Sequence, residues 1–342
     1  MPAPSLTATL SLVEIYGGLE LPDSQWVDVN GPVHYREWEG PARGPTFVCV
    51  HGLGGSLLNW AAVAPGLARH GRVLALDLAG FGLTPTAGRK ADVGAGRKLL
   101  DGFLKAHRLR RVVLVGNSMG GKVCLIHAAH APSSVKGLIL TDAVFPRARA
   151  MSGQPSVQIA LVFALYSNRR LGQMIASNRA RRLGAEGLVK GTLRLCAADP
   201  SSIDPRLVDA HIELAKQRME FDYATSAFLE AARSIFRTQV TPGKYRRLVQ
   251  RVEAPALVMH GEKDRLVPVG AAREAAEHHE NWELVIFPDL GHIPQMEAPD
   301  RWLETVEAWL PAISRRPSGA RRAGRRAPAT TPRYQEAYPS RR

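Results

Sequence analysis

The chain has 342 residues, of which 45% are apolar, and it carries a formal net charge of +14. This length can bury one large domain with an inserted subdomain, and the longest apolar run, residues 159–166, falls short of the ~20 residues that span a bilayer. The N-terminus lacks a secretory signal pattern, and three cysteines are too few for a disulfide framework, so we expect a cytoplasmic protein without a transmembrane segment.

Most of the positive charge lies at the C-terminus. Residues 315–342 contain nine arginines and one acid, Glu336, and so contribute +8 of the +14. The stretch is rich in Pro, Ala, Ser and Thr and has no apolar periodicity, which predicts a disordered tail over residues 314–342. Such a tail can contact anionic surfaces. It offers only Tyr334 and Tyr338 for base stacking, which argues against a specific nucleic-acid partner.

In chain order, residues 1–25 are predicted to form a loosely ordered lead-in, followed by a β-hairpin. Its strands, residues 26–29 and 32–38, flank Asn30-Gly31, a pair that accepts the positive φ of a tight turn. Further strands alternate with helix-length segments, at residues 47–50, 73–76, 112–115, 138–140, 257–259 and 284–287. The alternation predicts an α/β fold with a mostly parallel eight-stranded sheet and helices on both faces, closed by a helix over residues 299–310.

The strand rhythm stops between residues 145 and 241, which are predicted to form an inserted helical lid. Helices are expected at residues 156–166, 205–219 and 225–236, the second with Asp204 as N-cap and Pro205 at its first position. Residues 26–144 and 242–313 then form the two parts of the core. The aliphatic residues 159–165 predict either an apolar substrate pocket or packing of the lid onto the core.

The most informative motif is G-x-S-x-G at residues 116–120, placed between a strand-like run and a helix-like segment. A serine on such a turn has its hydroxyl exposed, and the flanking glycines leave room for the tight backbone. Ser118 is therefore a candidate nucleophile for acyl transfer.

A serine hydroxyl needs a base, and the base needs an orienting carboxylate. Asp264 follows the strand-like residues 256–260, and His292 follows residues 282–287, so both lie at the carboxyl edge where α/β sheets place their chemistry. Asp142, which follows another strand, is an alternative acid. The Asp-x-x-Val-Pro context favours Asp264.

The glycine-rich residues 51–55 follow the strand at 47–50 and can supply an oxyanion donor. We assign the two donors to the backbone amides of Leu53 and Met119.

These motifs, together with residues 77–82, 261–264 and 291–292, resemble the α/β-hydrolase superfamily over residues 26–310, except in the middle stretch between residues 145 and 241. The resemblance implies the α/β-hydrolase fold with an inserted lid, a structural role for Asp77, and no cofactor.

The other candidate ligands are interpreted as structural. His127 and His130 have the i, i+3 spacing of a metal pair, but no third ligand accompanies them, so no metal is expected. His51, His260 and the three cysteines are interpreted as packing residues.

The predicted function is a serine hydrolase that forms an acyl-enzyme on carboxylic esters with an apolar acyl or ring portion. One alternative is a carbon–carbon hydrolase, because residues 116–121 and Trp60 are similar to the meta-cleavage-product hydrolases. Ile293 and the Leu53-Gly54-Gly55 loop depart from the Trp and Gly-Pro-Gly usual in those enzymes. A second alternative is a catalytically silent binding protein that acts through its basic tail.

Overall fold

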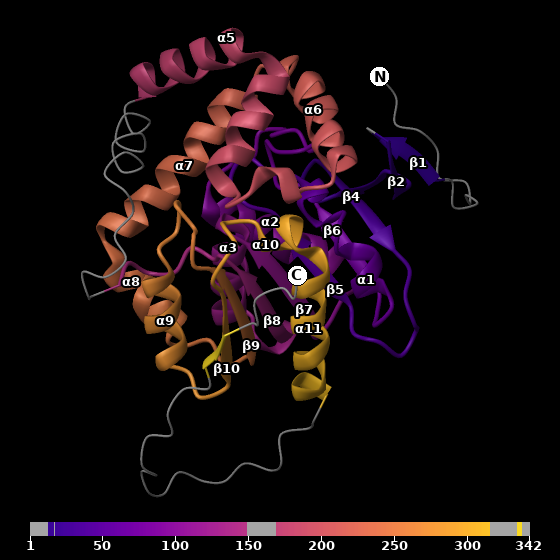
Figure 1. Ribbon diagram of the computed structural model, residues 1–342, viewed down its shortest axis with the longest axis vertical. Helices are drawn as coiled ribbons and strands as arrows, with labels where there is room; N and C mark the ends of the chain where they lie inside the picture. The colour runs from indigo at the N-terminus through magenta and orange to yellow at the C-terminus, as the bar shows by residue number, and fades with distance from the viewer. Residues whose placement is uncertain (1–12, 17, 149–168, 315–333, 337–342) are drawn as a thin grey trace, which may run out of the picture.

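The computed structural model describes residues 13–16, 18–148, 169–314 and 334–336 (Figure 1). A nine-stranded sheet lies at its centre, in the order β11-β10-β9-β8-β7-β5-β6-β4-β3. Its strands are β3 (Gln25–Asp28), β4 (Pro32–Trp38), β5 (Phe47–Val50), β6 (Val73–Leu76), β7 (Val112–Asn117), β8 (Val135–Thr141), β9 (Ala256–Gly261), β10 (Trp282–Phe287) and β11 (Tyr334–Glu336). The eight predicted strands are confirmed, as is the antiparallel β3–β4 hairpin.

Apolar clusters on both faces hold the sheet between helices. In β5, Phe47 and Cys49 belong to one cluster and Val48 and Val50 to the other, because successive side chains of a strand point to opposite faces. The first cluster includes residues of η1 (Leu57–Trp60), α1 (Ala64–Ala68), α10 (Pro294–Glu297) and α11 (Pro299–Ser314). The second includes residues of α2 (Val93–Ala106), α3 (Met119–His130), α8 (Pro242–Val249) and α9 (Val269–Glu277). Helices on both faces are therefore confirmed.

Three helices, α5 (Arg169–Cys196), α6 (Pro205–Met219) and α7 (Ala224–Val240), belong to the segment predicted to form a lid and lie beyond one end of the sheet (Figure 1). The helices predicted at 205–219 and 225–236 are confirmed, and Asp204 Oδ1 caps α6 by accepting from Arg206 N at 2.8 Å. α5 is not evident from the sequence, because its two halves meet at Gly184 with φ of 62° and share no single apolar period. The helix predicted at 156–166 lies outside the described residues.

Two segments predicted to lack order contain strands. In the lead-in, β1 (Val13–Tyr16) pairs with β2 (Leu19–Pro22), and the buried side chains of Tyr16 and Leu21 join the cluster that contains α1 and α11. In the tail, β11 adds to the exposed edge of β10 in parallel, where open backbone groups accept another strand. The prediction is wrong for these residues, and the remainder of the tail lies outside the described ranges. None of the described helices is long and apolar enough to cross a membrane.

A buried lysine joins the core to the lid. Lys122 of α3 is fully buried, and its Nζ donates to Thr238 Oγ1 of α7 and lies 4.4 Å from the ring centre of Tyr245 in α8. Burial lowers the pKa of Lys122 to about 7. The folded protein therefore resists protonating an amine that the unfolded chain protonates readily.

Replacing Lys122 with methionine is expected to stabilise the protein most at neutral and acidic pH. Between pH 7 and 10.5 the unfolded chain binds the extra proton, so wild-type stability rises with pH over that interval. Since one pKa unit corresponds to about 1.4 kcal/mol, the advantage of Lys122→Met in free energy of unfolding should shrink by about 2–3 kcal/mol from pH 7 to pH 9. Urea unfolding of both proteins at pH 7 and pH 9 measures this difference in free energy of unfolding. A difference that does not change with pH would contradict a neutral buried amine at Lys122.

Candidate active site

Ser118 lies on the sharp turn between β7 and α3. Its φ of 54° and ψ of −116° are unusual for a residue with a side chain, and such strain is concentrated at functional sites. The turn is fixed by backbone hydrogen bonds: Ser118 N donates to Thr141 O at 3.1 Å, and Ser118 O accepts from Lys122 N and Val144 N. The sequence pattern thus corresponds to a strand-to-helix elbow with the serine at its apex.

The glycines of the elbow are required by close backbone approach. A Cβ on Gly120 would lie 2.0 Å from Val50 O, and one on Gly116 would lie 2.6 Å from Gly121 Cα. Since carbonyl and Cα atoms belong to the rigid backbone, neither contact can be relieved by a side-chain rotation.

Replacing Gly120 with alanine is therefore expected to lower the free energy of unfolding by about 3 kcal/mol, the upper range for overpacking a core. Gly243→Ala in α8 is a matched control, because the nearest atom to its Cβ would be Arg247 Nη1 at 3.8 Å. The control should be neutral or stabilising, as alanine favours a helix. Urea unfolding compares the two, and equal effects would show that the elbow tolerates a side chain.

Asp264 and His292 form a hydrogen-bonded pair. Asp264 Oδ2 lies 2.7 Å from His292 Nδ1, while Asp264 Oδ1 accepts from Leu266 N at 2.7 Å and from Val267 N at 3.0 Å. Because a carboxylate can only accept, Nδ1 carries the hydrogen and Nε2 is left as the basic nitrogen. The pair lies at the edge of the sheet where β9 and β10 end, as the sequence predicts.

Asn117 connects this pair to the serine turn. Its Nδ2 donates to Thr141 O and to His292 O, both at 3.1 Å, so the residue before Ser118 holds the backbone of the histidine loop. Ser118 Oγ itself makes no hydrogen bond within the described ranges. Bonds between nucleophile and base are often long in a free enzyme and tighten only when substrate is bound.

Asp142, the alternative acid, lies in the same buried cluster. Ligand atoms of Asp142, Asp264 and His292 are all within 4.8 Å of one another. Asp142 Oδ1 accepts from Gly261 N at 3.0 Å, whereas its Oδ2 is buried without a donor in the described part of the chain.

The two carboxyl groups have opposite pKa shifts. Burial and the nearby negative charge of Asp264 raise the pKa of Asp142 well above its usual value. Burial would also raise the pKa of Asp264, but attraction to His292 and hydrogen bonds from His260 and His292 outweigh it and lower that pKa. These opposite shifts favour the neutral form of Asp142 and the charged form of Asp264, the partner of the imidazole.

Two further residues of this site are not singled out by the sequence. His260, interpreted as a packing residue, is buried with Nε2 2.8 Å from Val267 O and 3.5 Å from both Asp142 Oδ1 and Asp264 Oδ2. Buried Glu297 accepts from Gly291 N at 2.9 Å and from Ala198 N of the lid at 2.7 Å. The one sequence feature that could have indicated Glu297 is its position five residues after His292, on a short helix.

The glycine-rich loop adjoins the serine. A Cβ on Gly52 would lie 3.1 Å from Ser118 Cβ, which places the loop directly beside the elbow. Leu53 N belongs to this loop and Met119 N to the first residue of α3, and neither donates a backbone hydrogen bond elsewhere among the described residues. Amides left free in this way can stabilise a developing oxyanion.

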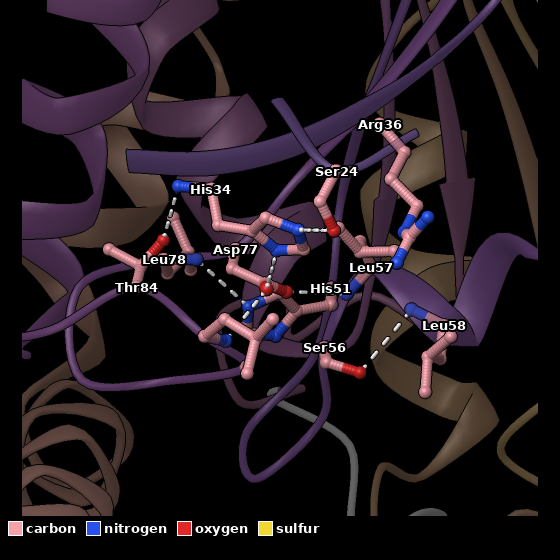
Figure 2. Close-up of polar contacts among 12 residues, drawn as sticks. Ser24, His34, Arg36, His51, Ser56, Leu57, Leu58, Asp77, Leu78 and Thr84 are labelled. Atoms are coloured by element: carbon pink, nitrogen blue, oxygen red, sulfur yellow. Dashed lines mark hydrogen bonds and ion pairs between the residues drawn. The ribbon is translucent and has the colours of Figure 1, made fainter. Parts of the chain in front are cut away.

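A buried network around Asp77 supports the same loop (Figure 2). Asp77 accepts from Leu57 N at 2.7 Å and from Leu83 N at 2.9 Å, and its Oδ2 lies 2.7 Å from His34 Nδ1. His51, which begins the glycine-rich loop, accepts from Leu78 N through Nε2 at 3.0 Å (Figure 2). These contacts fix the loop relative to the ends of β5 and β6.

The lid contacts every loop of the site. Arg218 of α6 donates to Gly80 O and Gly82 O, and a Cβ on Gly54 would lie 3.3 Å from the ring of Phe228 in α7. At the end of α5, Cys196 O accepts from His292 N at 2.7 Å. Residues of the predicted lid therefore lie against the glycine-rich loop, and one of them is hydrogen-bonded to the backbone of His292.

Among the described residues, one group could hold a metal ion at this site, Asp142, Asp264 and His292. Its members have other partners, since Asp264 is hydrogen-bonded to His292 and Asp142 accepts from Gly261 N. The suspected pair His127 and His130 has separate partners, since His127 Nε2 lies 2.9 Å from Ser134 Oγ and His130 Nδ1 lies 2.8 Å from Ile126 O. The arrangement is that of a proton relay rather than of an ion site.

Comparison with known proteins identifies the family to which this chain belongs. Residues 45–299 match the family described as alpha/beta hydrolase fold, and the chain belongs to this family.

Its relatives within the family differ in activity. The chain is 29% identical over 273 residues to the dihydrolipoyllysine-residue acetyltransferase component of an acetoin cleaving system from Pseudomonas putida, covering 79% of this chain and 65% of that protein. It is 28% identical to the 2-hydroxy-6-oxo-2,4-heptadienoate hydrolase of Pseudomonas putida F1, covering 79% and 90%. A solved structure of a membrane phospholipase A, described as a bacterial virulence factor, superposes with a TM-score of 0.65 at 26% identity, covering 85% of this chain and 86% of that one. The chain thus spans about two thirds of the first relative and most of the other two.

Proposed function

We propose that this α/β hydrolase is a serine hydrolase of carboxylic esters. The observation that carries the proposal is the 2.7 Å hydrogen bond between Asp264 and His292, held by Asn117 beside the strained turn of Ser118. Nucleophile, base and orienting acid are the three roles that acyl transfer by a serine requires.

In this mechanism Ser118 Oγ attacks the ester carbonyl carbon while its proton passes to His292 Nε2. The charge of Asp264 stabilises the imidazolium, and the amides of Leu53 and Met119 stabilise the oxyanion by about 3 kcal/mol each. His292 then returns the proton to the departing alkoxide, leaving an acyl-enzyme. Water, deprotonated by His292, attacks the acyl carbon and restores the serine. No step requires a cofactor.

An apolar acyl or ring portion is the proposed specificity. Phe228 contacts the glycine-rich loop, and the lid that carries it covers the site. The aliphatic residues 159–165, for which the sequence predicts either an apolar pocket or packing of the lid onto the core, lie outside the described ranges.

Carbon–carbon bond hydrolysis is the second candidate. It is favoured by the similarity to 2-hydroxy-6-oxo-2,4-heptadienoate hydrolase over 90% of that protein. Comparing turnover of p-nitrophenyl esters with turnover of a 2-hydroxy-6-oxo-dienoate separates the two candidates.

Labelling with a fluorophosphonate tests the proposal directly. We expect one covalent adduct on Ser118, located by peptide mass mapping, and turnover of p-nitrophenyl esters that varies with acyl chain length. A folded protein that takes no label and cleaves no ester would instead be a binding protein on a hydrolase scaffold, and the proposal would be wrong.

A further inference from the structure

Helix α5 combines exposed apolar side chains with positive charge. Of the seven large hydrophobic residues exposed in the described part of the chain, four lie on α5: Leu171, Met174, Leu183 and Leu195. The same helix carries seven arginines and lysines but a single acid, Glu186. In Figure 1 its first part crosses the top of the molecule, away from the sheet.

Five exposed residues of α5 form one continuous stripe. Arg170, Met174 and Asn178 follow one another at spacings of four residues, and Arg181 and Arg182 lie three and four residues after Asn178, which places the five on one face of a helix. Arg181 Nη2 donates to Asn178 Oδ1 within the stripe. The stripe ends before the kink at Gly184, so it lies on a single straight segment.

A hollow of about 560 Å³ lies beside the stripe. It is lined by Arg170, Gln173 and Met174 of α5 and by Ser226 and Arg233 of α7. Two guanidinium groups, an amide and a hydroxyl thus surround a methionine, and none of the described residues that line the hollow is acidic. Guanidinium groups bind phosphate oxygens with two hydrogen bonds, while the methionine can contact an attached hydrocarbon.

We propose that the stripe and the hollow dock the protein on a lipid surface that contains anionic phospholipids, with a headgroup phosphate in the hollow. Charge and apolar exposure together fit such a surface. A nucleic acid fits less well, because α5 contains no Phe, Tyr or Trp on which bases could stack.

The docking helix is connected to the catalytic loop. Cys196 O at the end of α5 accepts from His292 N, and Glu297 joins the segment after α5 to Gly291 N. A protein docked through α5 would present its lid to the lipid, so the docked enzyme would draw acyl esters from that surface. This consequence rests on the proposed function, whereas docking itself does not.

Vesicle sedimentation with the full chain tests docking. We expect binding to equimolar phosphatidylcholine and phosphatidylglycerol but weak binding to phosphatidylcholine alone. Each basic residue near an anionic membrane is worth about 1 kcal/mol, so Arg170→Gln/Arg181→Gln/Arg182→Gln should weaken partitioning by roughly 10²-fold. Met174→Ser should weaken it several-fold and equally at low and high salt. Circular dichroism and thermal unfolding confirm that the variants fold.

A triple variant elsewhere is the matched control. Arg108→Gln/Arg110→Gln/Arg111→Gln removes three exposed arginines just before β7, at the opposite end of the strands, and retains the C-terminal tail. It should bind anionic vesicles like the wild type. Equal weakening of both triple variants, or none in the stripe variant, would overturn the proposal. A third outcome would also overturn the proposal: heparin competes fully with vesicles for the protein, and the Met174→Ser substitution does not change heparin binding. That outcome indicates a general polyanion site.

Wild-type turnover of a soluble p-nitrophenyl ester separates this inference from the proposed function. Vesicle binding without turnover would refute the hydrolase and leave the docking surface intact. Turnover without vesicle binding would refute the docking surface alone.

Discussion

Replacing Ser118 with alanine is expected to reduce kcat/KM for p-nitrophenyl esters by about 10⁵-fold, the scale of removing a triad nucleophile. The oxyanion amides and the lid remain in place, so residual activity above the uncatalysed rate should persist. Alanine retains the Cβ and leaves the backbone hydrogen bonds of the turn unchanged, so the free energy of unfolding should stay close to wild type. Fluorophosphonate labelling should disappear together with turnover.

The protein provides its own control for this prediction. Ser24 Oγ lies 3.0 Å from His34 Nε2, and His34 Nδ1 lies 2.7 Å from Asp77 Oδ2, which reproduces a Ser-His-Asp chain (Figure 2). This chain differs from the candidate site because Ser24 precedes an edge strand rather than a helix, and because Asp77 is also engaged by two backbone amides. Ser24→Ala should therefore leave turnover within a few-fold of wild type. Loss of activity in Ser24→Ala with retention in Ser118→Ala would reassign the nucleophile.

The contact between Asp264 and His292 could be predicted because it follows from the order of the strands. Each residue comes directly after a strand of a parallel sheet, and all such strands end at one edge. β9 and β10 are neighbours, so the two side chains meet there. The same reasoning predicted the six parallel strands β5 to β10, whose apolar runs are almost wholly buried.

Other features depend on packing that has no local signal. Asp142 and Asp264 are 122 positions apart, and only the parallel pairing of β8 with β9 places the carboxyl groups together. Nothing in the local sequence distinguishes His260 from a buried histidine that only packs in the core. The strands β1 and β11 are short segments whose order depends on partners elsewhere in the chain, so propensity alone predicts them as irregular.

Asp264→Asn is expected to lower kcat/KM by about 10⁴-fold, as loss of the orienting acid does in a serine triad. An asparagine amide in place of Oδ2 would donate to Nδ1, which places the imidazole hydrogen on Nε2, where Ser118 needs a base. Asp142→Asn should cost less than about 10-fold, because the raised pKa of Asp142 favours its neutral form and the asparagine amide is also neutral. Steady-state kinetics of the two variants on one ester compares them.

The pH dependence of kcat/KM gives a second test of whether Asp264 or Asp142 is the orienting acid, independent of the size of the rate losses. The acid limb of kcat/KM reports protonation of the base in the free enzyme. If Asp142 is protonated, Asp142→Asn changes no charge and the limb stays where it is in the wild type. If Asp142 were ionised beside His292, removing its charge would destabilise the imidazolium and move the acid limb to lower pH. That shift, together with a larger loss in Asp142→Asn than in Asp264→Asn, would transfer the role of orienting acid to Asp142.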